Sequence, residues 1–317
     1  MHKPIDAPPW RWFFGNAEQR GLAWRYWVSE SAHGLGHMAI YYATRALPID
    51  TVSALGNFVG RKFGRRAYPE ADRRARENWA RLRSNDAAQA EAITDYAFGQ
   101  TGRVHWEFAI VDRLLQGDRL TIDGAEHLRA AQAAGRPILV ACLHLSNWEV
   151  IGIALTLSGQ RVSSIYQPPP NRFDHRIAVN SRRRWGWIPT PSGPSGARLA
   201  YRRLVERQCA MGIYIDECID EHVYAPFFGR KLKLEGNIAL VARLATMTGA
   251  AVIPAYVVRG DGAHFHATFM PPIDLVSGGD RDAELVQNVA RINATVEPVI
   301  RKHLDQWFWL FDLRLDP

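Results

Sequence analysis

PILVACLHLSNWE, residues 137–149, decides the fold class of this 317-residue chain. Its first part, residues 137–143, is a nearly continuous apolar run, which is typical of a strand buried on both faces in a sheet flanked by helices. His144 follows this strand directly. In α/β sheets, ligand sites gather beyond the carboxyl ends of the strands. We therefore expect a buried strand that carries His144 to the edge of a site.

The sequence on either side of this stretch alternates between strand and helix patterns. Strands are expected at residues 120–122, 162–166, 211–215, 251–258, 264–269 and 307–313, and helices at residues 125–134, 172–185, 197–207, 236–248 and 282–304. The strand at 264–269 is expected to be antiparallel. This alternation predicts an α/β fold with a central, largely parallel sheet flanked by helices.

The first third of the chain has a different pattern. Apolar residues recur at three- and four-residue spacing through residues 20–115, which predicts helices. Its start is rich in aromatic residues: Trp10, Trp12, Phe13, Phe14, Trp24, Tyr26, Trp27, Tyr41 and Tyr42. This pattern fits an amphipathic helix at a membrane interface, and it equally fits a helical layer packed on the core. We divide the chain into an N-terminal helical, membrane-associating region, residues 1–115, and an α/β core, residues 116–317.

The charge balance favours anionic partners. The formal charge is +7 and the pI is near 9.5, which is compatible with nucleic acid, an anionic membrane face or an acidic carrier protein. The basic clusters are Arg61, Lys62, Arg65, Arg66, Arg73, Arg74, Arg76, Arg81 and Arg83, and then Arg182, Arg183 and Arg184. A solvated helix face explains any single arginine, whereas the clusters as a whole favour an anionic surface.

Several classes of protein and site are disfavoured. No stretch reaches the roughly 18 continuous apolar residues of a spanning helix, and the N-terminus lacks the pattern of a signal peptide. Cys142, Cys209 and Cys218 have neither even pairing nor CxxC spacing, so no disulfide framework or zinc site is predicted. A metal site of Cys142, His144 and Glu149 would lack a second His or Cys nearby. We expect a reducing, cytoplasmic location, no metal and no cofactor.

His144 and Glu149 form a candidate catalytic pair. Ser146 and Asn147 can cap a helix that begins near Trp148, and a carboxylate in its first turn could bond the imidazole and fix its tautomer. The free ring nitrogen would then take a proton from a substrate hydroxyl. No G-x-S-x-G motif is present, which argues against a serine hydrolase. The alternative is a strand-end histidine beside a helix-capping glutamate, without catalysis.

Several colinear blocks resemble one known family. They are residues 122–128, residues 135–149, residues 225–229, residues 242–254 and the Arg-rich stretch Arg73 to Leu82 with Asn78 in its middle. Together they resemble the bacterial lipid A biosynthesis acyltransferases, the late lauroyl and myristoyl transferases of the lysophospholipid acyltransferase superfamily. The hallmark of that superfamily is a His, four residues and an acidic residue. The likeness covers roughly residues 70–260 and implies a glycerolphosphate-acyltransferase-like core.

The resemblance implies a reaction and a location. His144 would be the general base on an acceptor hydroxyl, and Glu149 would orient it. The hydroxyl would attack an acyl thioester carried on acyl carrier protein or coenzyme A. The acceptor would be a membrane lipid at the cytoplasmic face of the bacterial inner membrane, with the enzyme attached as a peripheral or monotopic protein. A thioester is already activated, so neither a metal nor a covalent enzyme intermediate is required.

The resemblance also suggests substrate contacts. They are Asn147 and Trp148 in the motif, Tyr166 and Gln167 at a family Tyr-Arg-Pro, Arg182 and Arg184 for anionic headgroups, Asp216 as the first acid of a family Asp-Gln-Asp, and Phe227, Phe228 and Gly229 for the acyl groove. The carboxylate of Asp216 could hold an acceptor hydroxyl or an arginine, or it could simply cap a loop. Two consecutive phenylalanines are also common in a core.

Four departures from the family pattern leave the acceptor open. Gln167 replaces an arginine, Cys218 replaces the second acid, residues 234–237 replace a Thr/Gly-rich stretch, and residues 307–312 lack a His/Arg cluster. A second hypothesis is therefore a related O- or N-acyltransferase acting on a different glycolipid, aminolipid or secondary-metabolite acceptor. A third is a basic binding module without catalysis. Because no nucleic-acid motif is present, we do not expect a nucleic-acid partner.

Overall fold

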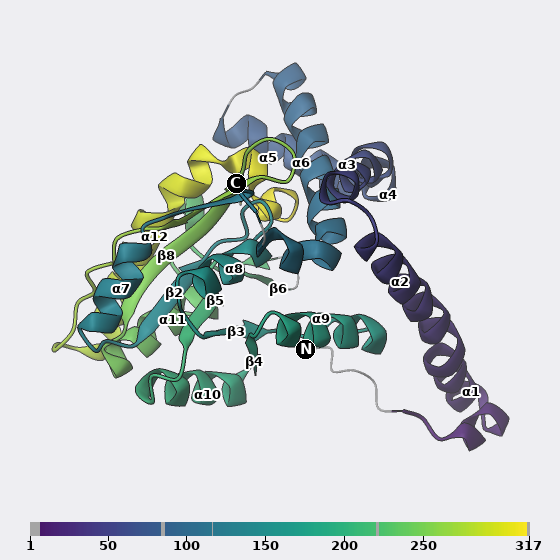
Figure 1. The fold of residues 1–317 in the computed structure, drawn as a ribbon, viewed down its shortest axis with the longest axis horizontal. Helices are drawn as coiled ribbons and strands as arrows, with labels where there is room; N and C mark the ends of the chain where they lie inside the picture. Colours follow the sequence, from purple (N-terminus) through teal and green to yellow (C-terminus); the bar gives the residue numbers. More distant parts are fainter. Residues whose placement is uncertain (1–6, 84–85, 116, 220–221, 316–317) are drawn as a thin grey trace.

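A seven-stranded sheet lies at the centre of the computed structural model, which describes residues 7–83, 86–115, 117–219 and 222–315 (Figure 1). In spatial order its strands are β1 (Leu120–Asp123), β9 (Phe265–Phe269), β8 (Ala251–Arg259), β2 (Ile138–Cys142), β5 (Ala210–Tyr214), β3 (Val162–Tyr166) and β4 (Ile188–Pro191). The strands from β8 to β4 are parallel, β9 is antiparallel to β8, and β1 is parallel to β9. The predicted α/β fold, its largely parallel sheet and the antiparallel strand are confirmed.

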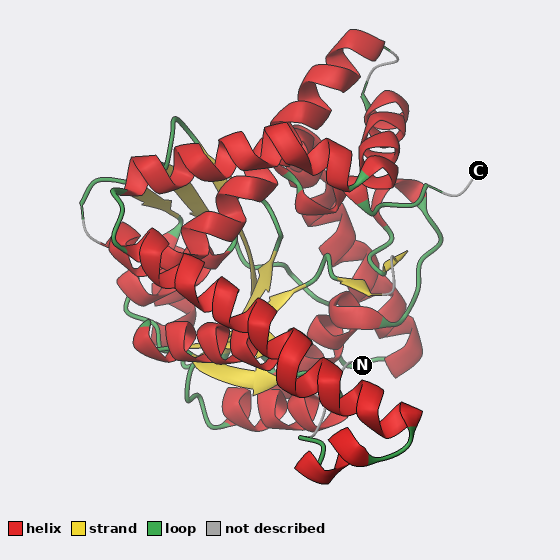
Figure 2. Cartoon of the chain, turned by 90° about the vertical axis from the view of Figure 1, so that its right-hand side faces the viewer, coloured by secondary structure: helices red, strands yellow, loops and turns green. Residues whose placement is uncertain are grey.

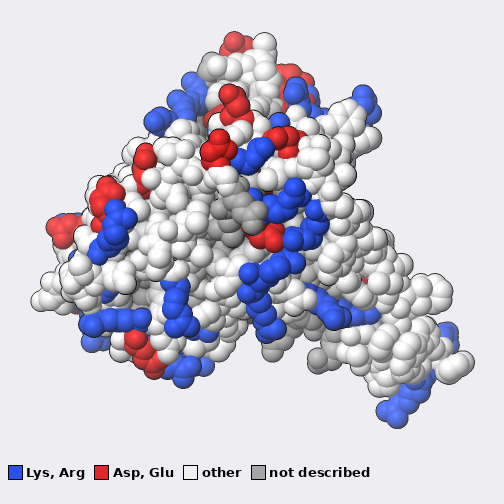
Figure 3. All heavy atoms as spheres, viewed as in Figure 1, with Lys and Arg blue, Asp and Glu red and all other residues white. Residues whose placement is uncertain are grey.

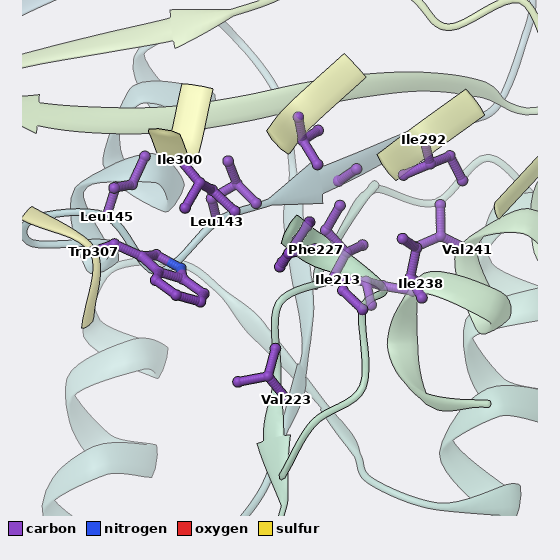
Figure 4. Close-up of a cluster of buried hydrophobic side chains, with 14 of the residues drawn as sticks. Leu143, Leu145, Ile213, Val223, Phe227, Ile238, Val241, Ile292, Ile300 and Trp307 are labelled. Atoms are coloured by element: carbon purple, nitrogen blue, oxygen red, sulfur yellow. The ribbon is translucent and has the colours of Figure 1, made fainter. Parts of the chain in front are cut away.

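Helices cover both faces of this sheet (Figure 2). They are α7 (Ala125–Ala133), α8 (Glu149–Leu157), α9 (Arg172–Arg184), α10 (Pro194–Val205), α11 (Gly236–Thr248) and α12 (Arg281–Lys302). Alternate side chains of β2 enter two different hydrophobic clusters. Leu139, Ala141 and Leu143 pack with α10, α11 and α12, and the intervening residues pack with α7 and α8. Figure 4 shows part of the first cluster, which also contains Trp307. Burial on both faces explains the continuous apolar run of β2.

The N-terminal region is helical, as predicted. Its elements are a 3-10 turn (Trp10–Phe14), α1 (Ala17–Trp24), α2 (Glu30–Arg45), α3 (Ile49–Val59), α4 (Arg65–Ala67), α5 (Pro69–Leu82), α6 (Ala87–Glu107) and a 3-10 segment (Phe108–Leu115). Helices α1 and α2 form a long arm at one side of the molecule (Figure 1). Helix α3 packs closely on α6 at two glycines, Gly56 and Gly102. A Cβ on Gly102 would lie only 2.1 Å from the Gly56 carbonyl oxygen, so only glycine permits this approach. The predicted domain boundary at residue 116, and residues 1–6, lie outside the described residues.

Two expectations about strands differ from the structure. The predicted C-terminal strand at 307–313 is wrong: Phe308–Phe311 is a 3-10 helix, and only a single bridge joins Trp307 to Leu145. The chain turns because the Trp309 carbonyl accepts from the N–H groups of residues 312 and 313. Strand β4 was not predicted, since it carries two prolines. Proline is tolerated there because β4 is an edge strand.

Among the described residues, no helix is both long and apolar enough to cross a membrane.

Candidate active site

The register of two neighbouring strands brings His144 and Asp216 together. Strands β2 and β5 are parallel, with Cys142 opposite Tyr214. His144 lies two residues beyond the end of β2, and Asp216 lies two residues beyond the end of β5. Both side chains therefore emerge at the carboxyl edge of the sheet, where ligand sites of α/β folds form.

The Asp216 carboxylate holds the imidazole of His144. Its Oδ1 lies 2.8 Å from His144 Nδ1, and its Oδ2 accepts the His144 backbone N–H at 2.8 Å and the Trp307 indole N–H at 2.9 Å. Asp216 is fully buried, so these bonds replace its water contacts. The indole Nε1 of Trp309 also lies 3.2 Å from Nδ1. Because one nitrogen cannot donate and accept at once, the shorter bond to the carboxylate decides: Nδ1 carries the proton and Nε2 is the free base.

Aromatic rings surround the imidazole and limit its movement. The ring centroids of Tyr214, Trp148 and Trp309 lie 4.3, 5.1 and 5.2 Å from that of His144. The Tyr214 hydroxyl donates to the Trp148 carbonyl at 2.8 Å, and burial raises the pKa of this phenol well above its usual value. The side chain of His144 is 16% exposed, which leaves it accessible to a substrate.

Glu149 does not bond the imidazole, contrary to expectation. It is the first residue of α8, and its carboxylate pairs with Arg182 of α9. The guanidinium of Arg182 in turn lies 4.7 Å from the Tyr166 ring centroid. The reason is positional: β5 places Asp216 beside His144, while the start of α8 directs Glu149 toward α9. The structure thus contains two separate pairs, His144–Asp216 and Glu149–Arg182.

A largely apolar groove lies beside these pairs. Its volume is about 510 Å³, and it is lined by α2, α6, the segment after α6, α9 and the start of α8. The lining residues are His37, Ile40, Tyr41, Thr44, Val104, His105, Trp106, Phe108, Ala109, Trp148, Glu149, Asp174 and Ile177. Trp148 both contacts the His144 ring and lines the groove. Trp148 therefore separates the groove from the His144 imidazole by the width of one ring.

The predicted acyl groove at residues 227–229 is wrong. Phe227 is fully buried in the hydrophobic core, and its ring packs against Trp307 at a centroid distance of 6.0 Å. Phe228 packs on the same indole at 5.8 Å. Gly229 has a φ of 78°, which marks a tight turn. The alternative interpretation of the two phenylalanines as core residues is therefore the correct one.

The remaining predicted substrate contacts differ in their surroundings. Asn147 is fully buried and donates to Glu107, so it faces the protein interior and not a substrate. Arg184 donates to the Tyr41 hydroxyl at 2.7 Å and pairs with Asp112 at 3.5 Å. Gln167 is exposed.

Tyr166 lies at the end of β3, and burial raises the pKa of its phenol to about 12. The Tyr166 phenol is therefore neutral, and its ring packs against the Arg182 guanidinium.

The residues near the site include a cysteine, a residue type that can serve as a nucleophile or as a metal ligand. Burial raises the pKa of the Cys142 thiol far above its usual value, so this residue is neither a thiolate ligand nor a nucleophile. Within the described ranges, no group of three or more His, Cys, Asp or Glu side chains is placed to hold a metal ion.

Sequence reasoning missed the C-terminal side of the site. Trp307 and Trp309 contact Asp216 and His144, and the Phe308 N–H donates to the His144 carbonyl at 3.0 Å. The signal was the run of aromatic residues at 307–311, which the sequence analysis assigned to a strand.

Comparison with known proteins identifies related sequences. Residues 22–314 match the model of a family described as bacterial lipid A biosynthesis acyltransferase. A phosphatidylinositol mannoside acyltransferase of Mycobacterium tuberculosis is 28% identical over 265 residues, covering 79% of this chain and 80% of the relative. Its counterpart in Mycolicibacterium smegmatis is 25% identical over 257 residues, covering 77% and 80%. A lipid A biosynthesis acyltransferase of Haemophilus influenzae is 24% identical over 233 residues, covering 71% and 69%.

Proposed function

The chain belongs to the bacterial lipid A biosynthesis acyltransferase family, and on that basis we propose that it transfers a fatty acyl chain from an acyl thioester to a hydroxyl of a membrane lipid. The thioester would be carried on acyl carrier protein or coenzyme A. One observation carries the proposal: the His144–Asp216 pair lies at the carboxyl edge of the sheet, next to a largely apolar groove.

In the proposed reaction, His144 is the general base. Its Nε2 takes the proton of the acceptor hydroxyl while the oxygen attacks the thioester carbonyl. A carbon–oxygen bond forms, the carbon–sulfur bond then breaks, and the imidazolium returns the proton to the leaving thiolate. Asp216 keeps the ring in the productive tautomer and stabilises the imidazolium, as the acid does in a Ser-His-Asp triad. Backbone N–H groups near the 144–149 turn would stabilise the oxyanion.

We assign Glu149 a different role from that of Asp216. Its pairing with Arg182 at the groove wall holds the guanidinium beside Tyr166 and Phe108. A guanidinium fixed in this way can bind a carbonyl or phosphate of a substrate in the groove. The groove volume falls in the range of about 300–1,000 Å³ that is usual for ligand sites, and its apolar lining fits an acyl or lipid chain.

The N-terminal helices supply the proposed membrane contact. Their exposed large apolar side chains are Trp10, Phe14, Leu22, Trp24, Val28, Leu35, Ile40, Tyr42, Leu55, Phe58, Phe63 and Tyr68. A concentration of exposed apolar residues of this kind marks an interaction surface, and tryptophan and tyrosine are favoured at headgroup depth. We therefore propose peripheral or monotopic attachment at the cytoplasmic face of the inner membrane through α1 to α4.

We propose that the basic side chains of α9 and α10, and not the N-terminal arginines, contact the anionic membrane surface. Within the described residues, five of the eight N-terminal arginines of the cluster pair with acids of the chain itself: Arg61 with Asp95, Arg65 with Asp72 and Glu91, Arg73 with Glu70 and Glu77, Arg74 with Glu70, and Arg76 with Asp72 and Glu91. By contrast, Lys and Arg side chains gather over α9 and α10 (Figure 3). Arg172, Arg182 and Arg184 of these helices pair with Glu30, Glu149 and Asp112, and Arg203 donates to Ser163 and Thr190. The proposed anionic contact therefore consists of the exposed side chains of Arg176, Arg183, Arg198 and Arg202.

The acceptor has two candidates, since relatives of similar identity are named for lipid A and for phosphatidylinositol mannoside. A lipid A precursor is the first candidate, and another glycolipid is the second. The test uses the purified protein with lauroyl thioesters of acyl carrier protein and coenzyme A against a panel of lipid acceptors. We expect acyl transfer that His144→Ala lowers about 10²–10⁴-fold, the factor that a positioned general base supplies. Activity of this variant within threefold of wild type, in a folded protein, would disprove the assignment.

A further inference from the structure

A buried ion pair that the proposed reaction does not use lies behind the catalytic segment. Glu107 ends α6 and Arg259 ends β8, and their side chains form two hydrogen bonds of 2.8 and 2.7 Å. The exposed fractions of the two side chains are 0% and 2%. Burying two charges costs solvation energy, which the pair recovers only when further hydrogen bonds satisfy it. The additional hydrogen-bond partners of Glu107 therefore help to stabilise the buried pair.

Those partners come from two different regions. The Ser53 hydroxyl of α3 donates to Glu107 Oε1 at 2.6 Å. The Asn147 amide donates to Glu107 Oε2 at 2.9 Å. Asn147 is fully buried, and its Oδ1 has no partner within the described part of the chain. The orientation of this amide is thus set by its bond to Glu107. One carboxylate joins the N-terminal helices to the segment between His144 and α8.

That segment contains a strained residue. Ser146 has a φ of 50°, a left-handed conformation that is unfavourable for a residue other than glycine, and it is 3% exposed. Its backbone N–H donates to the Gln306 carbonyl at 2.9 Å. The Gln306 side chain in turn accepts from the Arg259 backbone N–H at 2.8 Å and donates to the Arg259 carbonyl at 3.3 Å. Strain of this kind persists only where the surroundings hold it.

Two chains of hydrogen bonds therefore converge on this turn. One runs from the Arg259 side chain through Glu107 to Asn147, and the other runs from the Arg259 backbone through Gln306 to Ser146. We infer that Glu107 and Arg259, acting through Asn147, are positioning residues that hold the strained turn and thereby aim His144. This inference rests on the proposed function.

The comparison of Asn147→Ala with Ser53→Ala tests the inference. Each variant removes one hydrogen-bond donor from the same carboxylate, but only Asn147 belongs to the catalytic turn. We expect Asn147→Ala to lower kcat at least tenfold, with KM for the acyl thioester within twofold of wild type. Both variants should lower the melting temperature by similar amounts, but Ser53→Ala should leave kcat within twofold of wild type. Asn147→Leu, which keeps the branched shape of the side chain without a donor, should reproduce the kcat loss and remains available if the alanine variant does not fold.

Each outcome has a defined meaning. Wild-type kcat in a folded Asn147→Ala or Asn147→Leu variant would overturn the inference, and so would an equal loss of kcat in Ser53→Ala. Failure of the proposed function is recognised separately, because it appears as transfer by the wild-type enzyme that does not depend on His144. A wild-type enzyme that depends on His144 while both Asn147 variants keep full kcat would refute the positioning role alone.

Discussion

Asp216 and Glu149 are both acidic residues near His144, yet they lie in different surroundings. Asp216 follows β5, is fully buried and accepts three N–H donors, one of them from the imidazole. Glu149 begins α8, pairs with Arg182 and lines the groove. Glu149 is five positions from His144 in sequence, whereas Asp216 is 72 positions away. The register of parallel strands, and not proximity along the chain, determines which acid holds the His144 imidazole.

The variant Asp216→Asn tests the first half of this comparison and should have the larger effect. The amide is neutral, so it no longer stabilises the imidazolium, and its NH₂ group would face N–H donors. We expect kcat to fall by about 10²–10⁴-fold, the range found for positioned acid–base groups. Initial rates of acyl transfer measure this, with circular dichroism to check folding. Turnover within threefold of wild type would mean that Asp216 does not hold the catalytic base.

The variant Glu149→Gln tests the second half and should have a smaller effect. It keeps the size of the side chain but removes the charge that pairs with Arg182. We expect a loss of roughly tenfold in kcat/KM, which corresponds to about 1.4 kcal/mol of transition-state binding. Arg182→Met should give a similar loss, and the double variant should add little, because the two residues act as one pair. A loss as large as that of Asp216→Asn would restore Glu149 as the residue that orients the ring.

Much of the fold could be predicted because it depends on local patterns. The apolar run of β2 predicted burial on both faces, and the spacing of apolar residues predicted the helices of the N-terminal region. The edge strand β4 was missed because its two prolines oppose the usual strand pattern. The C-terminal strand was wrongly predicted because aromatic residues favour strands wherever they occur, although at Phe308–Phe311 they pack in a 3-10 helix.

The site was predictable only in part, since its contacts join distant segments. His144 was identified from its place after β2. The pairing of His144 with Asp216 depends on the register of β2 with β5, and the contact with Trp309 depends on how the chain returns after α12. The first leaves no local signal, and the aromatic run at 307–311 shows that these residues pack but not against what. The burial of Asn147 was likewise hidden, because its partner Glu107 lies 40 positions away.

The smallest predicted effect on catalysis concerns Glu217, which adjoins Asp216 but has fewer partners. Its carboxylate accepts the Asn237 backbone N–H, and burial raises the pKa of Glu217 to about 7. The unfolded chain would lose this proton near pH 4.3. Between those two pH values the folded protein keeps a proton that the unfolded chain has released, so this group's contribution to stability falls as pH rises, and it is constant above about pH 7.

Glu217→Gln should remove that dependence without the kcat loss expected for Asp216→Asn. The loss avoided is roughly 3–4 kcal/mol, so above pH 7 the variant should melt several degrees higher than wild type. Below about pH 4.5 the two melting temperatures should converge, because the carboxyl is then protonated in both states of the wild-type chain. Melting curves from pH 4 to 8 measure the difference. A difference that stays constant over this range would show that the Glu217 carboxyl titrates normally.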